Sequence, residues 1–220
     1  MRRTTAPDRH PLASPLDRHS FHVQPCGASG LLRCQADVMV TVRGSMIVIT
    51  GPPGAGKSTV SRIVADSFDT SVLLIGDEFH HFIRRGYVSP WLPESERQNE
   101  VVIDSTAAAA VSYAMGGYLV VVDGIIGPWF LERWLTHVPD ELPVSYIILR
   151  PSKDVAVRRA TERAGERDLI SSGPVVLMHD VFTERGGFDD HVLDSSEMTA
   201  EETATAILKL VDEGRLLLRR

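Results

Sequence analysis

One segment of the chain has the residue types and spacing of a phosphate-binding loop: Gly51-Pro52-Pro53-Gly54-Ala55-Gly56-Lys57-Ser58-Thr59. It follows an apolar, β-branched segment, 46–50, and precedes a segment with a helical pattern, 57–68. In this context the glycines let backbone N–H groups turn toward phosphate oxygens at the positive end of a helix. Lys57 is expected to reach the β- and γ-phosphates, and the Ser58 hydroxyl to bind Mg²⁺. The motif therefore predicts a nucleoside triphosphate site.

Acidic residues follow two further apolar segments that are expected to be strands. Residues 71–76 lead into Asp77, and residues 118–123 end in Asp123 before Gly124. Ligands of an open parallel sheet lie at the carboxyl ends of its strands, so both carboxylates are expected beside the phosphate loop. Asp123 is predicted to bind Mg²⁺, and Asp77 to accept the proton of an attacking hydroxyl. The alternatives are that Asp123 opens a turn and that Asp77 caps a helix.

Six basic residues gather in the segment 150–167, and helical spacing places Arg159 and Arg163 on one face. The pattern then breaks toward a loop after Arg167. We predict a lid in which Arg159 and Arg167 contact the nucleotide and Arg163 stabilises charge on the transferred group. The predicted catalytic residues are thus Lys57, Asp77 and Arg163. The alternative is a solvated face whose arginines pair with nearby acidic residues.

The segment 79–99 mixes polar and aromatic residues between the second expected strand and a long expected helix. An acceptor site is expected there. The predicted acceptor-binding residues are Asp77, His80, Arg84, Asp123 and Gly124. Arg84 and Arg85 either clamp an acidic group of the acceptor or are solvated charges.

From residue 46 onward, apolar segments alternate with helical patterns, which is typical of a parallel sheet with helices on both faces. The apolar strands are expected to be buried on both faces. The expected strands are 46–50, 71–76, 118–123, 144–149 and 190–194. The expected helices are 57–68, about 95–115, 128–136, 152–164, 174–183 and 199–213. Thr199 and Glu202 have the spacing of a capping box at the start of the last helix.

With Asp77, Asp123 and the arginine-bearing segment, the loop resembles that of the small P-loop phosphotransferases. This group includes shikimate kinase, gluconate kinase, adenylate kinase and chloramphenicol phosphotransferase, and the similarity covers roughly 46–213. The chain is most similar to the chloramphenicol phosphotransferase type, through the segment from Gly116-Gly117 to Asp123 and through Glu132-Arg133-Trp134. The segments Gly76-Asp77-Glu78-Phe79-His80 and Pro90-Trp91-Leu92 also resemble gluconate kinase.

The resemblance implies a three-layer α/β P-loop fold, with a five-stranded parallel sheet in the order 2-3-1-4-5, helices on both faces and a lid. It also implies ATP rather than another nucleotide as donor, and Asp77 as general base. Residues 45–220 are then expected to form the P-loop kinase domain. Residues 1–44 are arginine- and proline-rich without periodicity, and we expect them to be disordered. An alternative is that translation begins at Met39 or Met46.

Composition limits the partners. A length of 220 residues suits one α/β domain, and a net charge of −6 does not favour nucleic acid as the main partner. No apolar run approaches the ~20 residues of a membrane span, and the first residues lack the apolar core of a secretory signal. The two cysteines, Cys26 and Cys34, form no metal-ligand pattern. We expect a cytoplasmic protein.

The leading hypothesis is an ATP- and Mg²⁺-dependent phosphotransferase that moves the γ-phosphate to a hydroxyl of a small molecule, such as an antibiotic or a sugar-like metabolite. One alternative is a nucleotide-dependent switch or NTPase that acts through a protein partner. Another is a polynucleotide end kinase, to which the basic N-terminal segment would contribute.

Overall fold

The computed structural model describes residues 44–164, 172–184 and 188–218, without the side chains of residues 163, 164 and 172. The N-terminal segment expected to be disordered therefore lies outside the described residues, apart from Gly44. The same holds for most of the predicted lid, including Arg167 and the side chain of Arg163.

Five parallel strands form one sheet in the order β2-β3-β1-β4-β5, which confirms the predicted order. The strands are β1 Ser45–Thr50, β2 Ser71–Ile75, β3 Leu119–Asp123, β4 Val144–Leu149 and β5 Val192–Leu193. Three of them, β1, β3 and β4, are buried along their whole length, as the continuous apolar character of their residues predicted. The edge strand β2 is only half-buried, because it has a neighbour on one side alone.

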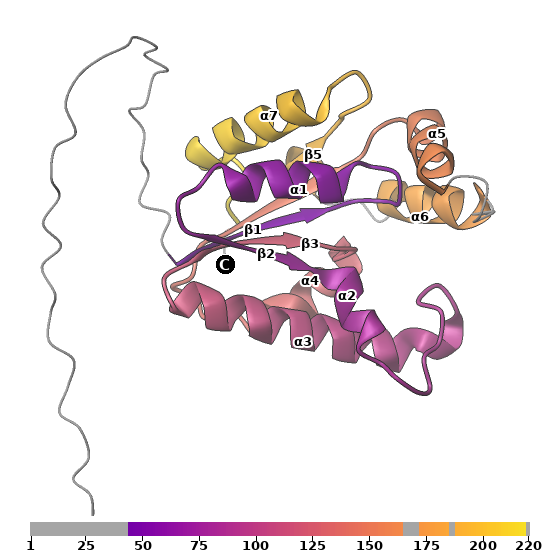
Figure 1. Ribbon diagram of the computed structural model, residues 1–220, viewed down its shortest axis with the longest axis horizontal. Helices are drawn as coiled ribbons and strands as arrows, with labels where there is room; N and C mark the ends of the chain where they lie inside the picture. The colour runs from indigo at the N-terminus through magenta and orange to yellow at the C-terminus, as the bar shows by residue number, and fades with distance from the viewer. Residues whose placement is uncertain (1–43, 165–171, 185–187, 219–220) are drawn as a thin grey trace, which may run out of the picture. The chain divides into compact units, whose positions relative to one another are not determined.

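Helices cover both faces of the sheet, with α1 and α7 on one face and α3 and α4 on the other (Figure 1). Side chains of β1 alternate between the two layers: Met46 and Val48 join the core under α3 and α4, and Ile47 and Ile49 join the core under α1 and α7. The helices are α1 Lys57–Asp66, α2 Gly76–His81, α3 Glu96–Met115, α4 Pro128–Leu135, α5 Lys153–Ala164, α6 Ser172–Glu184 and α7 Ala200–Asp212. The capping box of Thr199 and Glu202 is present at the start of α7.

Two elements differ from the sequence-based expectation. The strand expected at 71–76 ends at Ile75, and Gly76 begins the short helix α2, which was not predicted. The strand expected at 190–194 is reduced to Val192–Leu193, because Asp189–His191 forms a 3₁₀ turn. Gly76 also lies close to the end of β3, since a Cβ on it would lie 3.2 Å from the carbonyl oxygen of Asp123.

Two glycines let the phosphate loop pack directly on neighbouring backbone. A Cβ on Gly51, whose φ is +142°, would lie 2.1 Å from the carbonyl oxygen of Leu149 at the end of β4. A Cβ on Gly54, whose φ is +80°, would lie 2.0 Å from the carbonyl oxygen of Ala156 in α5. Only glycine fits at either position, so the loop, β4 and α5 are held in one arrangement.

Gly54→Ala is expected to lower the free energy of unfolding by more than about 2 kcal/mol, because it adds a clash with Ala156 to the strain of a left-handed alanine. Gly56→Ala is the matched control: φ is +90° at Gly56, but a Cβ there would meet nothing within 4 Å. The free energy of unfolding of Gly56→Ala is expected to fall by only about 1 kcal/mol. Urea unfolding of the two variants measures the difference, and equal losses would contradict the packing argument.

Candidate active site

The phosphate loop ends where α1 begins, so it presents the free N–H groups of a helix N-terminus. Lys57 is the first residue of α1, and its Nζ donates hydrogen bonds to the carbonyl oxygens of Gly51 (3.0 Å) and Pro52 (3.1 Å). These bonds hold the ammonium group over the loop. Ser58 and Thr59 are exposed in the first turn of α1, where the Ser58 hydroxyl is accessible to a cation.

Asp123 is the last residue of β3 and is 4% exposed. It pairs in register with Ile49 of β1, one residue before β1 ends and two before the phosphate loop begins. The next residue, Gly124, donates its N–H to the carbonyl oxygen of Ile49 (3.4 Å). The structure thus places a buried carboxylate beside the strand that leads into the loop, as predicted.

The segment after Asp123 is held by two buried side chains that the sequence analysis did not single out. The N–H of Ile126 donates to the hydroxyl oxygen of Thr50 (3.0 Å). The Tyr146 hydroxyl donates to the carbonyl oxygen of Ile126 (2.8 Å), and burial raises the pKa of Tyr146, so that it stays a neutral donor. Because Thr50 and Tyr146 lie on β1 and β4, they fix the segment against the centre of the sheet.

Asp77 lies in the first turn of α2 and is exposed. The residue that caps α2 is Ile75, with no side-chain capping bond, so the alternative role of Asp77 as a cap is wrong. The helix starts close to the end of β3, because a Cβ on Gly76 would lie 3.5 Å from the Cα of Gly124. The segments that carry Asp77 and Asp123 therefore meet at the carboxyl edge of the sheet.

His80 is half-buried in α2, one turn after Asp77. Burial lowers the pKa of His80, although the Asp77 charge acts in the opposite direction. The His80 ring packs edge-on against Tyr87, with the ring centroids 6.5 Å apart. Arg84 is exposed in the loop that follows α2.

A cavity of about 290 Å³ lies beside the phosphate loop. Its walls come from the loop and α1, from α5, and from the segment between β5 and the second turn of α7. Arg159 lines it and donates from Nη2 to the carbonyl oxygens of Ser195 (3.1 Å) and Met198 (3.4 Å). The cavity is at the small end of the range for ligand pockets, roughly 300–1,000 Å³. The structure thus brings Arg159 to the same cavity as Gly56 and Thr59, and its contact with a nucleotide stays a prediction.

The 195–203 side of this cavity was missed by the sequence analysis. These residues carry no phosphate- or metal-binding motif, and the only signal is their position after the last strand of a parallel sheet.

None of the helices in the described part of the chain has the length and apolar character of a membrane span.

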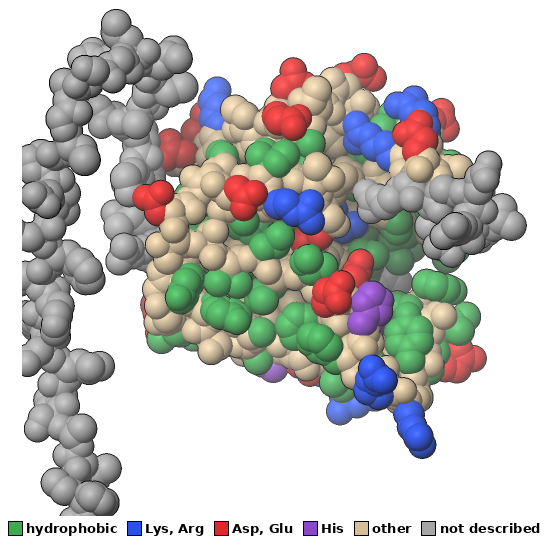
Figure 2. Space-filling model, in the orientation of Figure 1, with side chains coloured by type: hydrophobic (Ala, Val, Ile, Leu, Met, Phe, Trp, Pro, Cys, Tyr) green, Lys and Arg blue, Asp and Glu red, His purple; other side chains and the backbone are tan. Residues whose placement is uncertain are grey.

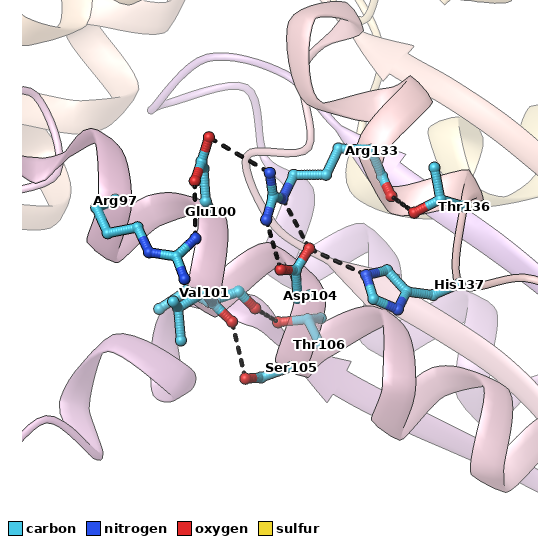
Figure 3. A network of polar contacts seen from close by, with 10 residues as sticks. Arg97, Glu100, Val101, Asp104, Ser105, Thr106, Arg133, Thr136 and His137 are labelled. Carbon is cyan, nitrogen blue, oxygen red and sulfur yellow. Dashed lines mark hydrogen bonds and ion pairs between the residues drawn. The ribbon is translucent and has the colours of Figure 1, made fainter.

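A polar network joins α3 to α4 and to the residue that follows Thr136 (Figure 3). Arg133 binds Asp104 through two hydrogen bonds, from Nε to Oδ1 (2.8 Å) and from Nη2 to Oδ2 (2.7 Å). His137 Nε2 lies 3.0 Å from Asp104 Oδ1, and Glu100 Oε1 lies 3.3 Å from Arg133 Nη1. The network therefore fixes the spacing between α3, which follows the predicted acceptor segment in the chain, and α4, which follows the segment after Asp123.

Comparison with known proteins agrees with this fold. A family model described as "AAA domain" matches residues 47–175, which span the phosphate loop, α2 and α5. A cytidylate kinase of Archaeoglobus fulgidus is 27% identical over 179 residues, which cover 77% of this chain and 96% of that protein.

Two solved structures share the fold at 20% sequence identity. The tunicamycin resistance protein of Deinococcus radiodurans has a TM-score of 0.56 and covers 81% of this chain and 100% of its own. A gluconokinase from Sinorhizobium meliloti has a TM-score of 0.57, with 78% of this chain and 95% of its own covered. The resemblance to small P-loop phosphotransferases is thereby confirmed for the fold.

Asp104→Asn tests the network through its pH dependence. The hydrogen bonds from Arg133 hold the pKa of Asp104 below its ordinary value of 3.8. A carboxyl with a lowered folded-state pKa stabilises the protein above its unfolded pKa, and this contribution is lost as the pH falls through the folded value. We expect Asp104→Asn to melt at a lower temperature than wild type at neutral pH. The gap should close as the pH falls below 3.8, and a gap independent of pH in thermal unfolding would contradict the assignment.

Proposed function

The chain belongs to the AAA domain family, and from that premise we propose that it is an ATP-dependent phosphotransferase. It moves the γ-phosphate of ATP to a hydroxyl group of a small molecule. The observation that carries the proposal is the meeting of three features at one edge of the sheet: the phosphate loop, the buried Asp123 and the exposed Asp77.

The residues present fit a magnesium nucleotide. Gly51 and Gly54 keep the loop backbone clear of side chains, so its N–H groups and those of the first turn of α1 are available to phosphate oxygens. The Ser58 hydroxyl and the Asp123 carboxylate are oxygen ligands of the kind Mg²⁺ takes in addition to phosphates and water. When bound, Mg²⁺ neutralises negative charge on the phosphates. Lys57 adds a cation that reaches the β- and γ-phosphates.

The cavity lined by Arg159 is the proposed nucleoside site, since it opens beside Gly56 at the end of the phosphate loop. Arg159 is held by carbonyl oxygens rather than by a carboxylate, so its charge is not neutralised by these partners. Arg163 and Arg167 are proposed to approach the phosphates from the same segment of the chain. Arg163 would stabilise the negative charge that develops on the leaving group, and Arg167 would contact the nucleotide.

Asp77 is proposed as the general base. As the hydroxyl oxygen of the acceptor bonds to the γ-phosphorus and the bond to the β-phosphate oxygen breaks, the hydroxyl proton passes to the Asp77 carboxylate. Most of the rate would come from alignment and charge neutralisation, because phosphoryl transfer needs little covalent help. His80, Arg84 and Gly124 line the proposed acceptor side, with Asp77 and Asp123 at its inner end.

A second acceptor is favoured by one specific observation, the similarity to a cytidylate kinase along 96% of that protein. In that case the group that attacks is a phosphate oxygen of a nucleoside monophosphate, and Asp77 would orient the acceptor rather than take a proton. The same assay distinguishes the two acceptors, because their products have different masses.

Asp77→Asn is expected to slow transfer to a hydroxyl by about 10²- to 10⁴-fold while ATP affinity stays close to wild type, because it removes the base and leaves the phosphate loop intact. Lys57→Ala is expected to lower both the rate of phosphate transfer and the affinity for ATP. Mass spectrometry of a metabolite and antibiotic panel incubated with ATP and Mg²⁺ measures the product.

Asp69→Asn is the matched control, since Asp69 is also exposed but lies at the opposite end of β2. It should transfer phosphate at the wild-type rate. Wild-type transfer by Asp77→Asn would remove Asp77 as the base. ADP formed without any phosphorylated compound would instead favour an NTPase that acts through a protein partner.

A further inference from the structure

Helix α6 lies beside α5, beyond the carboxyl ends of the strands (Figure 1), and none of the residues proposed to bind or react belongs to it. It nevertheless carries Phe182, which is 1% exposed and belongs to the core under α3 and α4. A ring of this size contributes a large apolar area to the place where it is buried. The burial of Phe182 therefore anchors α6 to the rest of the domain.

The segment that leads from β4 into α5 holds α6 through two hydrogen bonds. Arg150 donates from Nη1 to the carbonyl oxygen of Phe182 (3.2 Å). This carbonyl is among the last four of α6, which accept no hydrogen bond within the helix. His179 Nε2 lies 2.8 Å from the carbonyl oxygen of Pro151, and it is the donor because a carbonyl oxygen only accepts. His179 and Phe182 are one turn apart, so one side of α6 lies on this segment.

The Phe182 ring contacts α4 through Trp129. Their ring centroids are 5.0 Å apart, in an edge-on arrangement. The Trp129 ring in turn lies on the backbone of Gly127, where a Cβ would lie 2.3 Å from it. Gly127 follows Ile126, which hydrogen bonds from β1 and β4 hold against the sheet. The ring pair therefore fixes α6 relative to the segment that follows Asp123.

Helix α6 also supports the helix that carries Arg159. Val175 of α6 packs with Ala156 and Ala160 of α5 in one buried cluster. The outer side of α5 carries charged side chains in contact with solvent (Figure 2), so its apolar contacts are made on the inner side. Ala156 also faces Gly54 of the phosphate loop. Because protein interiors are close-packed and transmit displacements, a shift of α6 passes to α5 and to Arg159.

We propose that Phe182 is a positioning residue for the nucleotide. It holds α6 to Trp129 and Arg150, and α6 sets the position of Arg159 in the cavity beside the phosphate loop. The inference rests on the proposed function, because that arginine is assigned there to the nucleoside site. Phe182 is buried, so it acts through Arg159 and not on the nucleotide itself. A ring that only filled the core would change the free energy of unfolding and leave the nucleotide affinity of the folded protein unaltered.

Phe182→Leu tests this role through nucleotide binding. Leucine leaves a gap beside Trp129 that the surroundings fill only in part, so α6 and Arg159 shift. Calorimetry of the full chain with Mg²⁺ and a non-hydrolysable ATP analogue, at a temperature where circular dichroism shows a folded protein, should give a Kd about five- to tenfold higher than wild type. The same substitution in an Arg159→Ala background should change the Kd by less than about twofold, because α6 acts through that arginine.

Trp129→Leu removes the same contact from α4 and should weaken binding to a similar extent, so this variant carries the test if Phe182→Leu does not fold. The double variant should bind no more weakly than either single one, because both substitutions break one contact. Trp129→Phe, which keeps an aromatic ring, should restore most of the affinity. Phe130→Leu is the matched control: its ring also lies against Trp129, with the centroids 6.2 Å apart, but it belongs to α4. It should bind the analogue as wild type does.

The proposal is overturned if folded Phe182→Leu binds the analogue as tightly as wild type, or if its loss of affinity persists in full without Arg159. An equal loss in Phe130→Leu would assign the effect to a general loosening of the core and overturn it as well. These outcomes leave the proposed function standing, since wild type would still bind the nucleotide and Arg159→Ala would still weaken it. Conversely, wild-type binding by Arg159→Ala would contradict the proposed nucleoside site itself, and the inference with it.

Discussion

At the carboxyl edge of the sheet, the phosphate loop approaches neighbouring backbone more closely than any side chain would allow. The phosphate loop touches the end of β4 at Gly51 and α5 at Gly54, and the start of α2 touches the end of β3 at Gly76 and Gly124. The contacts at Gly51 and Gly54 need a residue without a Cβ, whereas a Cβ on Gly76 or Gly124 would come no closer than 3.2 Å to its neighbours. Because of Gly51 and Gly54, the phosphate loop, the end of β4 and the arginine-bearing helix α5 are held in one arrangement, and the geometry of the candidate nucleotide site depends on these two glycines.

The two halves of the site differ in physical character. On the nucleotide side, Asp123 is buried and Arg159 is held by backbone carbonyl oxygens, which suits a site that must fix phosphates in one position. On the proposed acceptor side, Asp77 is exposed, while Gln98 holds the backbone of Val88 in the loop after α2. Phosphoryl transfer requires alignment of both partners, and the proposed function assigns the donor to the rigid side and the acceptor to the open side.

The sequence predicted best what depends on local pattern. The strand–loop–helix around Lys57 and the capping box at Thr199 follow from residue spacing alone, and both are present. The strand order followed from a resemblance rather than from the residues, since apolar strands look alike wherever they lie in a sheet. The helix α2 was missed because it begins at a glycine, a poor helix former, and is only six residues long.

Other parts of the site depend on residues far apart in the chain. Arg133 and Asp104 are 29 positions apart, and Tyr146 and Ile126 are 20 apart, so no spacing rule connects them. The predicted positions of Asp77 and Asp123 at the carboxyl edge of the sheet nevertheless agree with the structure, because parallel strands bring their carboxyl ends together. Their chemical roles stay predictions.

The most direct test of the account follows the γ-phosphate itself. ATP labelled at the γ-position would be incubated with the protein, Mg²⁺ and the low-mass fraction of a cell extract, and the labelled products separated by mass. The account predicts that the label moves to one small molecule. Label released only as inorganic phosphate, with no labelled compound, would contradict a phosphotransferase and leave a nucleotide hydrolase in its place.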